Sequence, residues 1–187
     1  MSVEIFYVKY FNGLGMKYFN GFSLENEEEL FSDYLEEHDY NVSGFSYGAQ
    51  RAFEYVYHSQ TRIDRLILIS PAFFQTQKPS FIRTQLRYFE ANKESYVKQF
   101  LENVAYPSTQ SLKKYLTIGT KEELNALLNY VWDEKKIKEV LNRGTTIEVF
   151  IGDEDKIIDS KEAINFFQEI STLYIIKKSG HLLEHTL

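Results

Sequence analysis

One short segment, residues 44–48, constrains the fold of this chain more than any other part of the sequence. It reads Gly-Phe-Ser-Tyr-Gly and so has the pattern Gly-x-Ser-x-Gly. The run before it, Tyr40–Ser43, is strand-like, and the run after it, Ala49–Tyr57, is helix-like. A serine between two glycines at such a junction indicates a tight and strained turn, because glycine tolerates the close backbone approach that the turn requires.

This strand–turn–helix context is that of a nucleophile elbow. In such an elbow the hydroxyl of Ser46 stands at the carboxyl edge of a sheet, and the backbone N–H of Tyr47 is placed to bind an oxyanion. Three fixed residues are a weak pattern, however, and an ordinary glycine-lined turn also explains them. The two interpretations differ in whether an acid and a histidine follow in the right order and context.

Length and composition indicate a single compact domain, residues 1–187, with a sizeable core. Apolar residues make up 43% of the chain, and it contains 15 Phe and 14 Tyr. Cysteine is absent, which excludes disulfides, thiolate metal sites and cysteine nucleophiles. The net charge of −6 argues against general nucleic-acid binding.

The sequence also bears on where the protein works. No apolar run reaches the ~18 residues that a membrane span needs. The first five residues, Met1–Ile5, contain an acid and lack the basic region that precedes the apolar stretch of a signal peptide. We therefore expect a cytoplasmic protein that has no membrane partner.

The order of elements predicts an α/β fold with a mostly parallel sheet of about six strands. The first two strands are expected to be antiparallel, because the turn at residues 12–15 joins them. The predicted strands are Val3–Phe11, Met16–Asn20, Tyr40–Ser43, Arg65–Ser70, Thr146–Ile151 and Leu173–Ile176. An acidic helix is predicted over about Asn26–Glu37, and another over Ser160–Ile170.

Between residues 73 and 143 the sequence shows helical patterns and no convincing strand. The predicted helices are Ser80–Tyr88, Glu94–Asn103, Lys121–Val131 and Glu134–Asn142. The part from about 73 to 131 therefore reads as a helical insertion that forms a lid over the carboxyl edge of the sheet.

An acid follows the strand that ends at Ile151, within the segment Gly152-Asp-Glu-Asp-Lys. Open α/β sheets bind ligands at the carboxyl ends of their strands, so this loop is well placed. We favour Asp155 over Asp153 and Glu154, because Gly-x-x-Asp before apolar residues looks like the acid loop of a hydrolase. Asp159 reads better as the N-cap of the helix that follows.

A histidine follows the last predicted strand, flanked by a glycine. We favour this residue, His181, over His38 and His58, which lie at helix ends, and over His185 in the terminal tail. The chain order Ser46, Asp155, His181 is that of an α/β-hydrolase. His181 would then accept the proton of the serine, and Asp155 would fix the tautomer of the imidazole.

A second oxyanion donor is expected where the strand before Asn20-Gly21-Phe22 ends. Hydrolases often carry His-Gly-x at this place. Our candidate is the backbone N–H of Phe22. Asn20 in place of histidine is acceptable, because the donor belongs to the backbone.

With these residues in hand, the chain resembles a reduced α/β-hydrolase, and more closely the BioV group of pimeloyl-ACP methyl ester esterases from ε-proteobacteria. The likeness extends from about Met16 to the carboxyl end, and residues 1–15 look like an extension. Only 22 residues separate Gly21 from Gly44, as in the BioV-like proteins, whereas larger hydrolases have room there for a further strand and helix. The stretches that carry the likeness are Phe19–Phe22, Val42–Ala49, Ile147–Gly152 and His181–Leu183.

The resemblance implies hydrolysis of the methyl ester of pimeloyl-ACP in biotin synthesis, with no metal and no cofactor. A general short-chain esterase or an acyl thioesterase remains an alternative, and an inactive hydrolase-fold binding module is another. In any of the enzymes, Trp132 and the many Phe and Tyr residues are expected to line an acyl pocket.

The implied partner, an acyl carrier protein, is strongly acidic, so an acidic chain needs a local basic surface to bind it. Residues 75–98 carry five basic residues against two acidic ones. Arg83 and Arg87 share one helix face, with Lys78 nearby, and we expect these three to meet the carrier. The neighbouring apolar face would roof the acyl channel. An ordinary amphipathic helix with a solvated basic face explains the same pattern.

Overall fold

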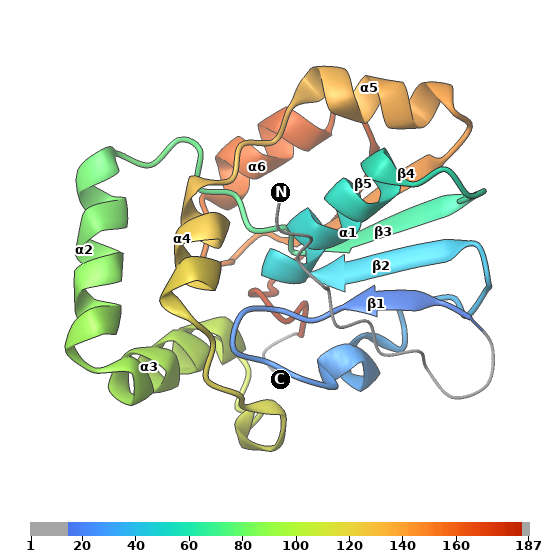
Figure 1. Cartoon of the computed structure of the whole chain (residues 1–187). Helices are drawn as coiled ribbons and strands as arrows, with labels where there is room; N and C mark the ends of the chain where they lie inside the picture. Colours follow the sequence, from blue (N-terminus) through green and yellow to red (C-terminus); the bar gives the residue numbers. More distant parts are fainter. Residues whose placement is uncertain (1–14, 185–187) are drawn as a thin grey trace.

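The computed structural model describes residues 15–184, and its centre is a sheet of five parallel strands (Figure 1). The strands lie side by side in the order in which they occur in the chain, β1-β2-β3-β4-β5. All described pairs are parallel, as expected for a chain in which strands alternate with helices. The strands are β1 Lys17–Phe19, β2 Asn41–Phe45, β3 Arg65–Ile69, β4 Thr146–Gly152 and β5 Thr172–Ile176.

Burial distinguishes the central strands from the edges. In β3, residues 66–69 are all at most 1% exposed, as expected for a strand that is covered on both faces. β5 is an edge strand of the described sheet, and its residues remain partly or fully exposed. The register aligns Phe45 with Ile69 and Ile69 with Phe150, so β2 and β3 end level with each other at one edge and β4 continues two residues further, to Gly152.

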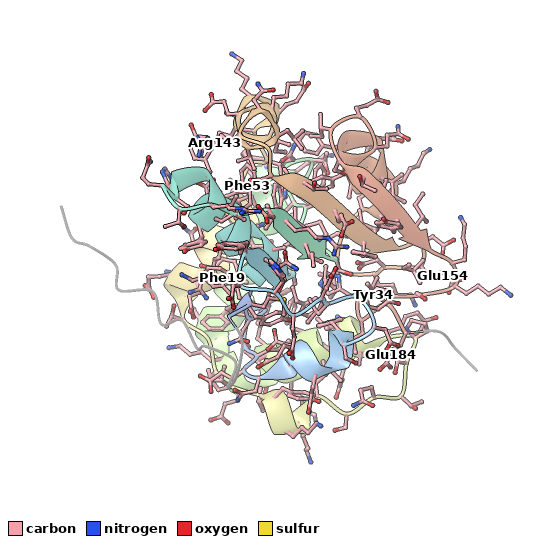
Figure 2. All side chains as sticks on the ribbon, turned by 90° about the vertical axis from the view of Figure 1, so that its right-hand side faces the viewer. Phe19, Tyr34, Phe53, Arg143, Glu154 and Glu184 are labelled. Atoms are coloured by element: carbon pink, nitrogen blue, oxygen red, sulfur yellow. The ribbon has the colours of Figure 1, made fainter. Side chains whose placement is uncertain are left out.

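Helices cover both sides of the sheet. In both views α1, α5 and α6 lie on one side and the short 3₁₀ helix η1 lies on the other (Figures 1 and 2). Side chains fill the space between these helices and the sheet, Phe53 of α1 among them, and it is fully buried. The helices are η1 Glu27–Phe31, α1 Tyr47–His58, α2 Pro79–Ala91, α3 Lys93–Ala105, η2 Lys113–Tyr115, α4 Lys121–Asn129, α5 Glu134–Asn142 and α6 Ser160–Phe167.

The helical insertion lies between β3 and β4, as the sequence predicts. Its helices α2, α3 and α4 stand beyond the carboxyl ends of the strands (Figure 1). Their starts follow from local capping: Asn92 accepts from Ser95 N–H at the start of α3, and Thr120 and Glu123 form a capping box on α4. One continuous cluster of buried apolar side chains includes residues of both the sheet and the insertion.

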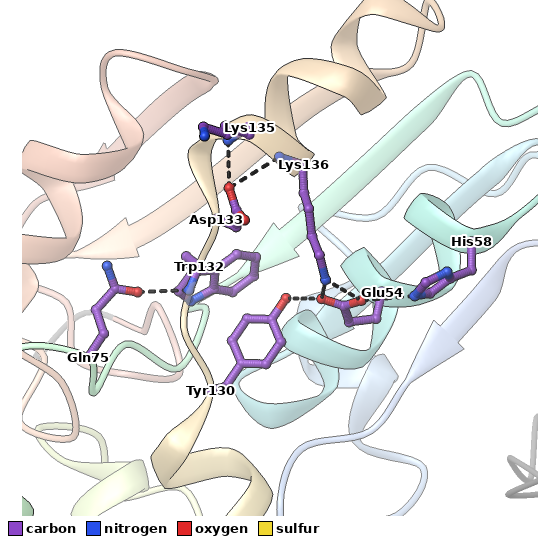
Figure 3. A network of polar contacts seen from close by, with 8 residues as sticks. All are labelled: Glu54, His58, Gln75, Tyr130, Trp132, Asp133, Lys135 and Lys136. Carbon is purple, nitrogen blue, oxygen red and sulfur yellow. Dashed lines mark hydrogen bonds and ion pairs between the residues drawn. The ribbon is translucent and has the colours of Figure 1, made fainter. Parts of the chain in front are cut away.

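The chain returns from the insertion to the sheet through a network of polar contacts (Figure 3). The backbone N–H of Trp132 donates to Gln75 Oε1 over 2.8 Å. Glu54 of α1 accepts from Tyr130 Oη at 2.8 Å and from Lys136 Nζ at 2.9 Å. These contacts tie the end of the insertion to α1, the helix that follows the Gly-x-Ser-x-Gly segment.

One predicted strand cannot be compared with the structure, and one predicted helix differs from it. The predicted strand Val3–Phe11 lies outside the described residues. The predicted helix over about Asn26–Glu37 is wrong: only the 3₁₀ helix η1 forms, and turns follow it. Asn26 has a left-handed backbone with φ of 58°, and the N–H groups of Tyr34 and Leu35 both donate to Phe31 O, which closes the helix at once.

Among residues 15–184, no helix is both long enough and apolar enough to cross a membrane.

Candidate active site

Ser46 sits at the turn between β2 and α1 in a strained conformation. Its φ of 55° and ψ of −112° lie outside the helical and strand regions, which is costly for any residue with a side chain. Three hydrogen bonds hold it there. Ser46 N–H donates to Ile69 O over 2.9 Å, and Ser46 O accepts from Ala49 N–H at 3.1 Å and from Ala72 N–H at 3.2 Å. The surrounding backbone therefore fixes the strained residue, as in a nucleophile elbow.

The two glycines of the segment are required by contact distances. A Cβ at Gly44 would lie 2.3 Å from Gly48 O, and a Cβ at Gly48 would lie 1.9 Å from Phe19 O. Both distances are far below van der Waals contact, and both obstacles are backbone atoms that cannot swing aside. The pattern therefore reflects the packing of β1, β2 and α1 around the serine.

Asp155 and His181 form a buried pair. Asp155 Oδ2 lies 2.6 Å from His181 Nδ1, and neither side chain has any exposed surface. The other carboxylate oxygen, Oδ1, accepts from Ile157 N–H at 2.7 Å and from Ile158 N–H at 3.3 Å. A carboxylate held in this way fixes the orientation of the imidazole and directs its Nε2 away from the acid.

The competing acids are occupied elsewhere. Asp153 accepts from Lys178 N–H at 2.7 Å and pairs with the Lys177 ammonium, so it ties two loops together. Asp159 caps α6 by accepting from Glu162 N–H at 3.2 Å, as predicted. Of the histidines, His38 and His58 are exposed on the surface, and His185 lies outside the described residues.

The acid and histidine loops touch because glycines let them approach. A Cβ at Gly152 would lie 2.3 Å from both Ser179 O and Gly180 O. A Cβ at Gly180 would lie 1.9 Å from Tyr106 O. Gly152 thus lets the acid loop approach the histidine loop, and Gly180 lets the histidine loop approach Tyr106 at the end of α3.

The end of β3 joins the pair to the serine. Ile69 O accepts from Ser46 N–H, and the hydroxyl of the next residue, Ser70, donates to His181 O over 2.7 Å. The ring of Phe45, which precedes the serine, lies 5.0 Å from the His181 ring. Within residues 15–184, Ser46 Oγ and His181 Nε2 are both buried and neither has a hydrogen-bond partner.

Ser70 was missed by the sequence reasoning. It is fully buried and has a φ of 40°, and it binds the backbone of His181. A signal did exist: Ser70 is a polar residue at the carboxyl end of an apolar strand, at the same edge as the predicted site.

The predicted oxyanion donors lie at the same edge. Tyr47 opens α1, where backbone N–H groups point out of the end of the helix. Phe22 lies in a turn after β1 that is closed by Leu24 N–H donating to Gly21 O. The Phe22 side chain is 2% exposed, and its ring centroid lies 6.1 Å from that of Phe89 in the insertion.

A cavity of about 550 Å³ begins at Tyr47 and follows α1 toward its end. Its lining includes the aromatic side chains of Phe19, Tyr47, Tyr55 and Tyr130 together with the charged residues Lys17, Arg51 and Glu54, and neither Ser46 nor His181 lines it. Trp132, expected to line an acyl pocket, does not line this cavity. It is buried against Phe53 and Phe167, and its indole N–H donates to Ala72 O.

Among residues 15–184, no group of three His, Asp or Glu side chains is arranged to hold a metal ion. The residues that the structure brings to this edge are a strained serine, a histidine oriented by a buried carboxylate, and backbone N–H groups at a helix end.

No family model matches the chain, and no curated protein matches it by sequence. Solved structures do match. MenH from S. aureus superposes with a TM-score of 0.61 at 15% identity, over 94% of this chain and 90% of that one. BioG from Haemophilus influenzae gives 0.60 at 12% identity, over 95% and 94%. Naproxen esterase (carboxylesterase NP) from Bacillus subtilis gives 0.60 at 13% identity, over 94% and 80%.

This chain has the α/β-hydrolase fold. In an α/β-hydrolase the serine, the acid and the histidine follow one another in this order along the chain. Here Ser46 follows β2, Asp155 follows β4 and His181 follows β5.

The fold is present in a reduced form. The described sheet has five strands, and the chain spans 57% of the length of the carboxylesterase CesB from Bacillus subtilis, with a TM-score of 0.53 at 18% identity. The short connection from β1 to β2 holds η1 and no further strand, as the spacing between Gly21 and Gly44 predicts.

Proposed function

We propose that this protein is a serine carboxylesterase whose substrate is the methyl ester of pimeloyl-ACP. The observation that carries the proposal is the buried Asp155–His181 pair, with 2.6 Å between Oδ2 and Nδ1, attached through the end of β3 to a strained serine. A carboxylate–histidine pair whose Nε2 accepts from a serine hydroxyl activates that hydroxyl for acyl transfer. In the structure Ser46 Oγ and His181 Nε2 are both buried and unpaired, so this last hydrogen bond would form when the substrate binds.

The first half of the reaction forms an acyl-enzyme. Ser46 Oγ attacks the ester carbonyl carbon while His181 Nε2 accepts the hydroxyl proton, and Asp155 stabilises the imidazolium. The carbonyl oxygen becomes an oxyanion, which the backbone N–H groups of Tyr47 and Phe22 would bind. The tetrahedral intermediate collapses, the bond to the methoxy group breaks, and His181 passes its proton to the departing methanol.

The second half releases the acid. His181 takes a proton from water, and the resulting hydroxide attacks the acyl carbon of the Ser46 ester. The oxyanion forms again at the same donors and collapses with transfer of the proton back to Ser46 Oγ. The products are pimeloyl-ACP with a free carboxylate, and methanol. The cycle needs no cofactor.

The substrate is supported by the sequence resemblance to the BioV group and by the short connection from β1 to β2. The aromatic side chains in the cavity that begins at Tyr47 favour an apolar acyl chain, which would enter it from Tyr47 because Ser46 itself does not line it. The similarity to naproxen esterase, at 13% identity, favours a second candidate, a carboxylesterase that acts on free esters. The two candidates differ in whether the acyl carrier protein contributes to binding.

Exposed cations on α2 and at its N-cap support a carrier as partner. Lys78, Arg83 and Arg87 are exposed, and none of them forms an ion pair with another described residue. α2 stands farthest from the sheet (Figure 1), and its inner side buries Phe89 against Phe22. A carrier on the outer side of α2 would therefore lie across one helix from the proposed oxyanion loop.

The decisive experiment compares methyl pimeloyl-ACP with free dimethyl pimelate as substrates. We expect kcat/KM for the carrier-bound ester to exceed that for the free ester by about 100-fold or more, because carrier contacts add binding energy. Ser46→Ala is expected to lower kcat by about 10⁴-fold or more on both esters. Equal kcat/KM values on the two esters would favour the second candidate, and an active Ser46→Ala would refute a serine mechanism.

The docking surface is tested in the same assay with Arg83→Glu/Arg87→Glu. We expect KM for methyl pimeloyl-ACP to rise about tenfold, with kcat/KM for dimethyl pimelate nearly unchanged, because like charges repel the acidic carrier. The matched control is Lys135→Glu/Lys138→Glu on α5, which makes the same change of charge away from α2. A similar rise in KM in both double variants would reduce the effect to net charge and reject α2 as the docking surface.

A further inference from the structure

Glu27 is a buried acid that the proposed mechanism does not use. It lies in η1, in an acidic run with Glu28 and Glu29, yet it has no exposed surface. A carboxylate is costly to bury without partners, so its contacts carry information about its role. Desolvation raises the pKa of Glu27 to about 7, and the hydrogen bond from Gly21 N–H acts against this rise.

The contacts of Glu27 point to the turn after β1. Its Oε1 accepts from Gly21 N–H at 2.7 Å and from Tyr18 Oη at 3.3 Å. Its other oxygen, Oε2, is buried and has no hydrogen-bond partner among residues 15–184. Gly21 is the residue directly before Phe22, so the carboxyl group holds the peptide next to the proposed oxyanion donor.

At Gly21 itself the Glu27 contact is a specific restraint on the turn, whereas the hydrogen bonds to the insertion involve Ser23 and Glu25. Gly21 has no Cβ to pack, and its nearest obstacle would be the ring of Phe45, 2.8 Å from an added Cβ. Ser23 lies in the left-handed region with φ of 60°, so the turn is strained two residues after Gly21. A short bond to a buried carboxyl oxygen is therefore a specific restraint on where Gly21 and Phe22 lie.

We propose that Glu27 is a positioning residue of the oxyanion hole, which holds the Phe22 N–H in its catalytic orientation through the hydrogen bond to Gly21 N–H. The inference rests on the proposed esterase function and names a residue that acts on the transition state through its neighbour. Both the ionised and the protonated carboxyl group retain an oxygen that accepts from Gly21. The restraint depends on the presence of an acceptor, and an amide oxygen can replace it.

The test uses the full chain and p-nitrophenyl acetate, which requires no carrier. Glu27→Ala removes the acceptor, and we expect kcat to fall about 30-fold with KM changed less than threefold, since oxyanion donors act on the transition state. Glu27→Gln keeps an acceptor oxygen in the same place and is expected to restore most of the lost kcat. Inhibition by a trifluoromethyl ketone, which forms an oxyanion on the serine, is expected to weaken by a similar factor in Glu27→Ala.

The matched control is Glu29→Ala, two residues along the same short helix. Glu29 also binds a tyrosine, Tyr115, but it is exposed and does not contact the Gly21 turn. If Glu27→Ala does not fold, Glu27→Asp takes its place, because it withdraws the carboxyl group by one methylene and is expected to show the same selective fall in kcat. Folding is checked by thermal unfolding of every variant.

Two results would overturn the inference while leaving the esterase proposal intact. One is a Glu27→Ala or Glu27→Asp variant with the kcat of Glu29→Ala. The other is a Glu27→Gln variant as impaired as Glu27→Ala, because the acceptor would then not be what matters. A wild-type protein without any esterase activity would instead refute the proposed function, so the two failures are distinguishable.

Discussion

The two halves of the candidate site are held in different ways. The Asp155–His181 half is built from loops that follow neighbouring strands of the sheet, and Gly152 allows the close approach of these loops. The carboxylate receives two backbone N–H groups besides the histidine, and Ser70 anchors the histidine backbone. This half depends on the carboxyl edge of the sheet, where the loops after β4 and β5 meet.

The oxyanion half, residues 20–25, is held mainly by the helical insertion and by one carboxyl group. Glu25 N–H donates to Tyr115 O at 2.8 Å, and Ser23 O accepts from Thr117 N–H at 3.0 Å. The hydroxyl of Ser23 accepts from Gly119 N–H at 3.1 Å. In addition, Glu27 Oε1 accepts a hydrogen bond from Gly21 N–H.

This difference indicates where the site is rigid and where it can respond. The loops of Asp155 and His181 follow strands paired within one sheet, whereas the oxyanion turn shares its hydrogen bonds with residues 115–119 of the insertion. A movement of residues 115–119 of the insertion would therefore act directly on the oxyanion turn, whereas the histidine loop contacts a different part of the insertion, at Tyr106 and Ser108. Binding at the lid would then act on the rate through the turn.

The largest expected effect comes from breaking the rigid half. Asp155→Asn preserves the shape of the side chain, but its amide donates to His181 Nδ1 and so favours the wrong imidazole tautomer. We expect kcat on p-nitrophenyl acetate to fall by about 10⁴-fold, with the thermal unfolding temperature changed far less than activity. The measurement is steady-state hydrolysis together with thermal unfolding.

The control for this variant is Asp159→Asn, which changes the cap of α6 four residues away. Asparagine caps helices as well as aspartate does, so kcat is expected to stay within about twofold of the wild type. If Asp155→Asn retained a tenth of the wild-type kcat, Asp155 would not orient the catalytic base, and the Asp155–His181 pair would not be the part of the site on which catalysis depends most.

The serine, the acid and the histidine of the site were predictable from the sequence because their signals are local. Ser46, Asp155 and His181 each follow an apolar run that is short enough to be a buried strand, and each lies close to a glycine. Parallel strands bring their carboxyl ends to one edge, so the chain order alone brings the three segments together. The insertion was predictable for the same kind of reason, since its helices show a clear apolar period and have caps.

The oxyanion half was less predictable because its contacts are between distant segments. Glu27 stands in an acidic run that reads as the exposed start of a helix, and nothing in the run distinguishes it from Glu28 or Glu29. Its burial follows from the 3₁₀ turn that replaces the predicted helix over Asn26–Glu37. Trp132 failed as a pocket residue for a related reason, because its indole N–H is bound to Ala72 O in the core.

A smaller effect concerns stability and comes from Glu27, which binds the oxyanion half. Burial raises the pKa of Glu27 from 4.5 to about 7, so between these values the folded protein holds a proton that the unfolded chain has lost. The unfolded state therefore binds fewer protons, and the stability contributed by Glu27 is complete below pH 4.5 and is lost as the pH rises through 7. Glu27→Gln cannot ionise and has no such dependence.

We therefore expect the free energy of unfolding of the wild type to fall relative to Glu27→Gln by about 2.5 kcal/mol between pH 5 and pH 8. Urea unfolding of both proteins at a series of pH values measures this difference. The control is Glu37→Gln, an exposed position on the same connection, whose difference from the wild type should stay constant with pH. A constant difference for Glu27→Gln as well would mean that the carboxyl group ionises normally, and that water or movement of the turn already relieves its burial.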